Sequence, residues 1–121
     1  MRIRIKTTNF RQNEASKALA EEKLALPVRK LLSKQDREMD IVLDVEFAKI
    51  TKHHNEGKIW KCEANLDLPH RNQILRAESF GESLEEAVNL VKYELMREIR
   101  KYKEKQTAKI RKGARQTKNR Q

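Results

Sequence analysis

The chain has 121 residues, of which 28 are Lys or Arg and 18 are Asp or Glu, so its formal charge is +10. This length predicts one small domain, and the basic balance predicts an anionic partner. No apolar run approaches the roughly 20 residues that cross a bilayer, and the first residues alternate in polarity, unlike a secretory signal. The single cysteine, Cys62, cannot form an internal disulfide. We therefore expect a cytoplasmic protein that does not bind membranes.

The positive charge is concentrated at the end of the sequence. Residues 1–100 carry 19 basic and 17 acidic residues, whereas residues 101–121 carry 9 basic residues and 1 acidic residue. Because residues 107–121 contain no aromatic and few apolar side chains, they cannot bury enough surface to offset the entropy of ordering. We predict a folded domain over residues 1–106 and a disordered basic tail over residues 107–121.

The first two predicted elements are a strand and a helix. Residues 1–7 alternate isoleucines with basic side chains, a period of two that is typical of a half-buried strand. Residues 13–33 have apolar side chains at helical spacing, which predicts an amphipathic helix. Pro27 lies inside this segment, and because it lacks an N–H and disfavours helix at the preceding residue, we expect a kink or a break there.

Three strands are predicted to follow. Residues 40–50 and 58–69 each place apolar side chains on one face and charged side chains on the other, with a hairpin loop at residues 51–57 between them. Residues 69–72 form the next turn, and residues 73–80 form the fourth strand. Strands that follow one another so closely predict an antiparallel meander.

The last predicted element is the longest helix. Ser83 and Glu86 have the spacing of a capping box, in which each side chain satisfies an otherwise unpaired backbone donor. Apolar residues then recur every three or four positions as far as Tyr102, which predicts one buried stripe. The opposite face carries three basic residues: Arg97, Arg100 and Lys101.

The predicted order of elements is therefore β-α-β-β-β-α. A helix between the first two strands makes them a parallel pair through a right-handed crossover, and the meander completes a four-stranded sheet. Both helices then cover its apolar face. We predict an α+β fold, a two-layer sandwich with two helices on one face of the sheet.

Other chemistry-bearing residues have simpler explanations. His53 and His54 are adjacent, so their side chains point in different directions, and no further residues complete a tetrahedral metal site. Cys62 alternates with apolar residues, which favours a buried, inert thiol. Trp60 and Tyr102 are interpreted as core residues. The carboxylates on the outer face of the sheet are explained by cross-strand pairing with Lys61 and Arg76: Asp44, Glu46, Glu63 and Asp67.

Four short segments together resemble a known family. They are residues 21–24 (Glu-Glu-Lys-Leu), 75–78 (Leu-Arg-Ala-Glu), 83–91 and 97–103 (Arg-Glu-Ile-Arg-Lys-Tyr-Lys). Their order and spacing are similar to those of the ribosome hibernation promoting factor and ribosome-associated inhibitor family, once called sigma-54 modulation proteins. The resemblance runs from residue 1 to about residue 105 and implies a double-stranded-RNA-binding-like fold. Long members add a C-terminal dimerisation domain, so we expect this sequence to be a short form.

The resemblance implies a binding protein rather than an enzyme. Its partner would be the small ribosomal subunit and its ribosomal RNA, bound at the decoding channel so that messenger and transfer RNA are blocked in idle ribosomes during stress or stationary phase. It implies no cofactor and no small-molecule substrate, and we expect a monomer when free. Similar proteins carry basic residues where Lys23, Arg97 and Lys101 stand, whereas a lysine is common where Glu94 stands here. The candidate RNA-binding residues are Lys23, Lys30, Lys92, Arg97, Arg100, Lys101 and Lys105.

The alternatives are another kind of binding protein and an enzyme. A general double-stranded-RNA-binding protein or a structural ribosomal protein would have the same fold and charge. A small ribonuclease would need an acid, a base and a phosphate-binding charge that converge on one site, and the sequence places no such set on one element.

Overall fold

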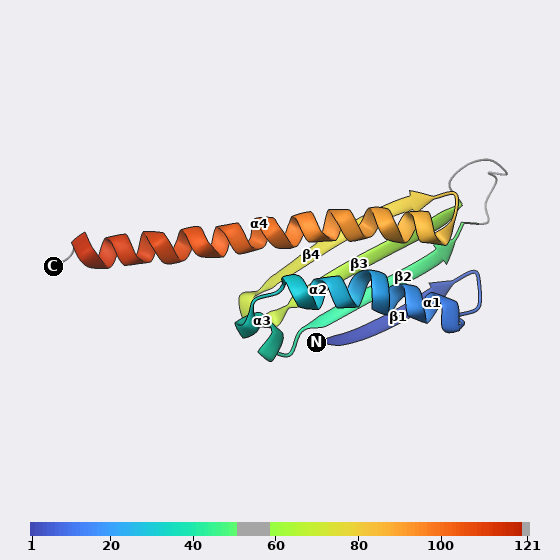
Figure 1. The fold of residues 1–121 in the computed structure, drawn as a ribbon, viewed down its shortest axis with the longest axis horizontal. Coiled ribbons are helices and arrows are strands. Elements are labelled where there is room, and N and C mark those ends of the chain that lie inside the picture. The colour runs from blue at the N-terminus through green and yellow to red at the C-terminus, as the bar shows by residue number, and fades with distance from the viewer. Residues whose placement is uncertain (51–58, 120–121) are drawn as a thin grey trace.

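The computed structural model describes residues 1–50 and 59–119, with side chains described as far as Gly113. The predicted hairpin loop at residues 51–57, with its histidine pair, lies outside these residues. Within them, the chain forms an α+β two-layer sandwich in which one helical layer covers one face of a four-stranded sheet (Figure 1). The predicted architecture is confirmed.

The sheet has the strand order β1-β2-β3-β4. β1 and β2 are parallel, and the two following pairs are antiparallel. The predicted crossover and meander are therefore both present, and each strand begins and ends within two residues of its expected limits. The strands are β1 Arg2–Thr8, β2 Val42–Lys49, β3 Trp60–Leu68 and β4 Gln73–Gly81.

The core lies between the sheet and the helices. Alternation along β2 and β3 turns their apolar side chains to the helical layer and their charged side chains to the other face. Cys62 and Tyr102 are buried as predicted, whereas Trp60 is half-buried at the margin, where its ring meets Phe10 edge-on at 5.2 Å. The large, fully buried side chains include Leu24, Leu43, Phe47, Leu66, Leu95 and Ile99.

The first helical segment begins at a capping box that the sequence analysis did not identify. Asn13 Oδ1 accepts a hydrogen bond from Ser16 N–H, and Ser16 Oγ accepts one from Asn13 N–H. These two bonds satisfy donors that have no partner inside the helix. The helix then continues in three joined pieces: α1 Glu14–Leu19, the π-helical η1 Ala20–Ala25 and α2 Leu26–Leu31.

Pro27 does not interrupt this helix. The chain stays helical through it, and the residue before it, Leu26, donates its N–H to Glu21 O five positions earlier. In a regular α-helix the proline ring would meet the carbonyl oxygen of Lys23 and would lack the matching N–H. We attribute the π-helical turn to this conflict, since a wider turn changes the carbonyl that the ring faces. The predicted disturbance therefore takes the form of a change in helix type.

A further short helix, α3 Lys34–Glu38, was not predicted. It begins at Ser33, whose Oγ accepts a hydrogen bond from Asp36 N–H. The carboxylate of Asp36 is buried and accepts hydrogen bonds from His70 Nε2 at 2.7 Å and Tyr102 OH at 3.1 Å, while Arg71 Nε lies 3.5 Å away. α3 is therefore held against the 3-10 helix η2 Pro69–Arg71 and the long last helix. The Ser-x-x-Asp spacing was the signal in the sequence.

The last helix, α4 Leu84–Asn119, follows β4 through a tight turn. Ser83 Oγ accepts a hydrogen bond from Glu86 N–H as predicted, but the Glu86 carboxylate accepts from Glu82 N–H, one residue earlier than in a regular capping box. Gly81 is required here because a Cβ atom would stand only 2.7 Å from the backbone nitrogen of Ala87. The turn therefore brings α4 directly onto the sheet.

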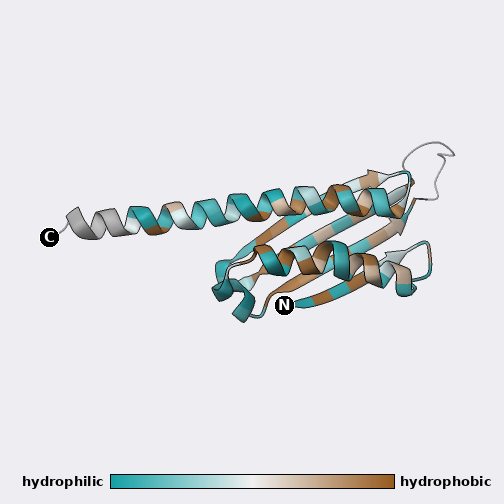
Figure 2. Ribbon diagram, in the orientation of Figure 1, coloured by the Kyte–Doolittle hydropathy of each residue, from teal (hydrophilic) through white to brown (hydrophobic). Residues whose placement is uncertain are grey.

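α4 crosses the predicted domain boundary at residue 106 without a break. Where the sequence predicts a disordered tail, the structure has helix as far as Asn119, projecting beyond the sheet (Figure 1). Tyr102 is the last buried residue among the described side chains, and the coloured part of α4 beyond it is mainly hydrophilic (Figure 2). The physical reason is that adding a residue to an existing helix costs far less than nucleating one. Residues 107–119 are also rich in helix-forming Lys, Arg, Gln and Ala.

Candidate nucleic-acid interface

Two of the predicted RNA-binding residues meet in a groove between α2 and α4. Lys30 and Arg100 are 70 positions apart in the sequence, yet both line this shallow depression. Both side chains are exposed, and neither forms an ion pair or hydrogen bond within the described part of the chain. The groove, which we call the helix groove, is lined by Pro27, Lys30, Leu31, Met96 and Arg100.

The helix groove is fixed by a contact that the sequence analysis did not predict. Lys103 Nζ donates a hydrogen bond of 2.9 Å to the carbonyl oxygen of Leu31, in the last turn of α2. Carbonyl groups at the end of a helix lack partners inside it, and a cation there is also favoured by the helix dipole. Met96 is buried beneath the groove. Lys103 therefore holds the two helices together and does not belong to the free charge of the surface.

Lys23 and Lys92 extend the helix groove toward the start of each helix. Lys23 precedes Pro27 by four residues, and Lys92 precedes Met96 by four, so each lies about one turn from a groove residue on the same side of its helix. Both are half-buried, and Lys92 Nζ lies 5.8 Å from the ring centre of Tyr93. Four of the seven predicted bases therefore flank one groove.

The other three predicted bases lie on another side of α4. Arg97, Lys101 and Lys105 follow one another at intervals of four residues, and all three are exposed. Lys101 Nζ lies 3.7 Å from a carboxylate oxygen of Glu98, a surface pair of little energetic weight. Glu94, one turn before Glu98, adds a second carboxylate to this side. Arg100 thus belongs with the helix groove, and the predicted set is divided between two sides of one helix.

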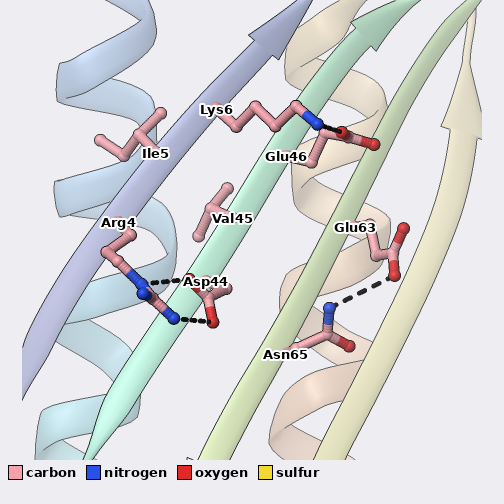
Figure 3. Close-up of a pocket in the computed structure, with 8 residues that line it drawn as sticks. All are labelled: Arg4, Ile5, Lys6, Asp44, Val45, Glu46, Glu63 and Asn65. Atoms are coloured by element: carbon pink, nitrogen blue, oxygen red, sulfur yellow. Dashed lines mark hydrogen bonds and ion pairs between the residues drawn. The ribbon is translucent and has the colours of Figure 1, made fainter.

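The outer face of the sheet is also rich in charged side chains, but most of its described bases are paired with neighbouring carboxylates. Arg4 donates to both carboxylate oxygens of Asp44, at 2.7 and 3.0 Å, and Lys6 Nζ lies 3.5 Å from Glu46 (Figure 3). The shallow pocket that these side chains line is therefore occupied by ion pairs of the protein itself. Figure 3 also shows Asn65 donating to Glu63 on β3.

Lys61 is the centre of this outer face. Its Nζ lies 3.4 to 3.9 Å from carboxylate oxygens of Glu63, Glu78 and Glu46, on three different strands. Burial lowers the pKa of Lys61, but the three carboxylates outweigh burial, and the net effect is a raised pKa. The predicted role of Lys61 is confirmed, whereas Arg76 stands opposite Asn65 and forms no ion pair with any described residue.

The remaining candidates for chemistry are not arranged for it. Burial raises the pKa of the Cys62 thiol to about 12, so it stays protonated at neutral pH. Among residues 1–50 and 59–119, no group of three His, Cys, Asp or Glu side chains is placed to hold a metal ion. None of the helices in the described part of the chain is long and apolar enough to span a bilayer.

A family comparison decides the relationship of the chain. The sequence profile of the family described as "Sigma 54 modulation protein / S30EA ribosomal protein" matches residues 3–107. The chain belongs to this family. The resemblance inferred from the four short segments is thereby confirmed, and the family is one of binding factors without catalytic activity.

Two solved structures show the same fold as this member of the sigma-54 modulation family. The N-terminal domain of Protein Y from Thermus thermophilus is 18% identical with a TM-score of 0.61, covering 84% of this chain and 99% of that one. A ribosomal subunit interface protein from Coxiella burnetii is 20% identical with a TM-score of 0.62, covering 85% of this chain and 98% of that one. No curated protein sequence matches the chain.

The family match does not extend over the whole of α4. It ends at residue 107, inside α4, and both solved structures are covered almost completely while about 15% of this chain has no counterpart in them. The family region thus contains the helix groove and about two further turns of α4 beyond Arg100, but not the outer part of that helix.

Proposed function

We propose that this protein is a ribosome hibernation factor. It binds the small ribosomal subunit and its ribosomal RNA at the decoding channel, and it blocks messenger and transfer RNA in idle ribosomes. Membership of the sigma-54 modulation family supports this proposal, as does the likeness in fold to a ribosomal subunit interface protein. The observation that carries it is the helix groove, where Lys30 and Arg100 present positive charge that no carboxylate of the described residues neutralises.

The mechanism is occlusion by a rigid body. Each base that neutralises an RNA phosphate releases condensed counterions, so binding is favourable and falls steeply with salt. Arg100 can direct two donors to one phosphate, whereas Lys30 acts as a point charge. Because the hydrogen bond from Lys103 to Leu31 fixes the spacing of the two helices, the charges are held in one arrangement, and shape rather than total charge selects the site.

The decisive experiment reverses the charge of the helix groove. We expect Lys30→Glu with Arg100→Glu to abolish co-sedimentation with small ribosomal subunits at moderate salt. The matched control is Arg11→Glu with Arg37→Glu, which changes the net charge equally at two exposed bases without described partners. If both double variants lose binding equally, or if neither does, the helix groove is not the contact surface.

Order of addition tests occlusion of the channel. We expect the protein to inhibit translation when it is added before messenger and initiator transfer RNA, and to inhibit much less when it is added to ribosomes already loaded with both. Equal inhibition in the two orders would contradict competition for the channel.

Competition with RNA separates this proposal from a general double-stranded-RNA-binding protein. An excess of short duplex RNA should leave a shape-specific factor on small subunits, because the duplex offers phosphates but not the ribosomal site. A general binder would be removed by the same competitor.

We further propose that the protein acts in the cytoplasm and that it is monomeric when free. The large exposed apolar side chains of the described residues are scattered over several elements and form no single patch that would favour a dimer.

A further inference from the structure

The outer part of α4 is a second basic element, separate from the helix groove. We call residues 105–119 the α4 extension. It projects beyond the sheet (Figure 1) and lies almost entirely outside the region matched by the family. No acidic residue occurs in the sequence after Glu104. The extension is therefore a feature of this chain that the family relationship does not explain.

The bases of the α4 extension form a stripe along the helix. Lys105, Lys109 and Lys112 are four and three residues apart, so they lie on one side of the helix, whereas Arg111, one residue before Lys112, faces another side. The same stripe continues backward to Lys101 and Arg97 at intervals of four. From Arg97 to Lys112 it is about 22 Å long, at the standard rise of 1.5 Å per residue.

Uncharged residues occupy the other side of the extension. Gln106, Ile110 and Gly113 are spaced by four and three residues, and Ile110 is the only large apolar side chain among the exposed residues of this part of the chain that the structure describes. A helix that lies on a lipid surface needs a continuous apolar side, which one isoleucine does not supply. The extension also offers no aromatic ring on which a nucleic-acid base could stack. The row of basic side chains on the extension is therefore suited to binding a row of phosphates.

The helical state of the extension also favours a polyanion. Like charges four residues apart destabilise a helix, and beyond Tyr102 no described side chain is buried to compensate for this. A row of phosphates along the stripe would remove the repulsion between Lys105, Lys109 and Lys112. Binding and helix formation are therefore coupled.

We propose that the α4 extension is a helical arm that binds the RNA phosphate backbone along the stripe of Lys105, Lys109 and Lys112, independently of the helix groove. That the polyanion is RNA rests on the proposed function, whereas the helical arm and its stripe of bases are observed independently of that function. The arm adds affinity and salt dependence without reading sequence.

The first test measures the salt dependence of binding to a short RNA hairpin, used as the probe. For the full chain, the slope of log Kobs against log salt should become shallower by about 1.5 to 2 in Lys109→Gln with Lys112→Gln. The control, Arg11→Gln with Arg37→Gln, removes two exposed bases elsewhere and should leave the slope unchanged. Equal slopes for the arm variant and the unmodified chain would overturn the proposal. So would tighter binding to anionic vesicles than to the hairpin.

The second test separates a helical arm from a flexible cationic tail at constant charge. Ala108 is exposed and lies between Lys105 and Lys109. Ala108→Pro interrupts the helix there, whereas Ala108→Gln preserves it. We expect the proline variant to bind the hairpin more weakly and to gain less helical circular dichroism on binding, while the glutamine variant matches the unmodified chain. Identical binding by both variants would show that the arm is a flexible tail.

The outcomes for the arm and for the proposed function are distinct. If the proposed function is wrong, reversing the charge of the helix groove will make no difference to co-sedimentation with small subunits, and the two arm tests with the hairpin keep their meaning. If only the arm proposal is wrong, the arm variants will match the unmodified chain on the hairpin while the helix-groove variant still loses small subunits.

Discussion

The two faces of the sandwich are both rich in charged side chains and use them differently. On the outer face of the sheet, Arg4 is paired with Asp44, Lys6 with Glu46, and Lys61 with three carboxylates. On the helical face, Lys30 and Arg100 have no carboxylate partner among the described residues. The total number of bases on a surface is therefore a poor guide to whether it binds an anion, and the number of bases without a carboxylate partner is a better one.

The largest effect is expected at Asp36, which joins α3, η2 and α4 beneath the helical face. Asp36→Ala removes the acceptor for His70 and Tyr102 and leaves Arg71 without its anion. We expect the free energy of unfolding to fall by about 3 kcal/mol, and small-subunit binding to weaken because α4 loses an anchor. Chemical denaturation and co-sedimentation measure the two effects. Tyr102→Phe, which removes one hydrogen bond, should cost only about 1 kcal/mol.

Asp36 also predicts a pH dependence. Burial raises its pKa, but the hydrogen bonds from His70 and Tyr102 and the charge of Arg71 outweigh burial, so its pKa in the folded protein lies below the ordinary 3.8. The stability that it contributes is therefore fully present above that value and is lost as the pH falls through the folded pKa. Unfolding experiments should show the difference between Asp36→Ala and the unmodified chain shrinking at the lowest pH values.

The next largest effect concerns binding alone. Neutralising the helix groove in Lys30→Gln with Arg100→Gln should weaken small-subunit binding by about tenfold or more. The free energy of unfolding should change by less than about 0.5 kcal/mol, because neither base has a partner to lose within the described residues. Denaturation together with a binding titration checks this. A marked loss of stability would mean that these bases are structural, and the contrast between the two faces would fail.

At Lys61 on the outer face we expect the reverse of the helix-groove result, that is, lower stability with unchanged RNA binding. Lys61→Gln leaves Glu46, Glu63 and Glu78 close together without a cation, so we expect a loss of about 1 kcal/mol in unfolding free energy and unchanged RNA binding. Its pKa is raised in the folded state, so its stabilising contribution is present below the ordinary 10.5 and is lost as the pH rises through the folded pKa. The variant and the unmodified chain should therefore converge in stability at strongly alkaline pH.

The smallest effect is expected at the pair between Lys101 and Glu98. Glu98→Gln frees Lys101 while costing at most about 0.5 kcal/mol of stability, since exposed pairs of this kind contribute little. Binding to RNA should tighten slightly, and the salt slope should steepen. A weaker affinity in this variant would show that Glu98 is needed to orient Lys101.

The fold could be predicted because its signals are local and repeated. The period of two in β2 and β3, the apolar stripe of α4 and the short connections leave few ways to bury the apolar side chains. Two elements were missed because their signals are weak or compete with others. α3 has only five residues, and the π-helical turn at η1 reflects a conflict between Pro27 and a carbonyl group that composition does not show.

The sequence by itself determined the strand order, the layer arrangement, the burial of Cys62 and Tyr102, and the family. Only the tertiary structure decided which bases share a surface. Lys30 and Arg100 meet because α2 and α4 pack side by side, Lys103 is used to join them, and Arg97 and Lys101 face another direction. The period of a helix assigns each base to a side of its own element, whereas the partner across a groove depends on how two elements dock. The formal charge of +10 predicts an anionic partner. Where the bases without a carboxylate partner come together is decided by the docking of the helices.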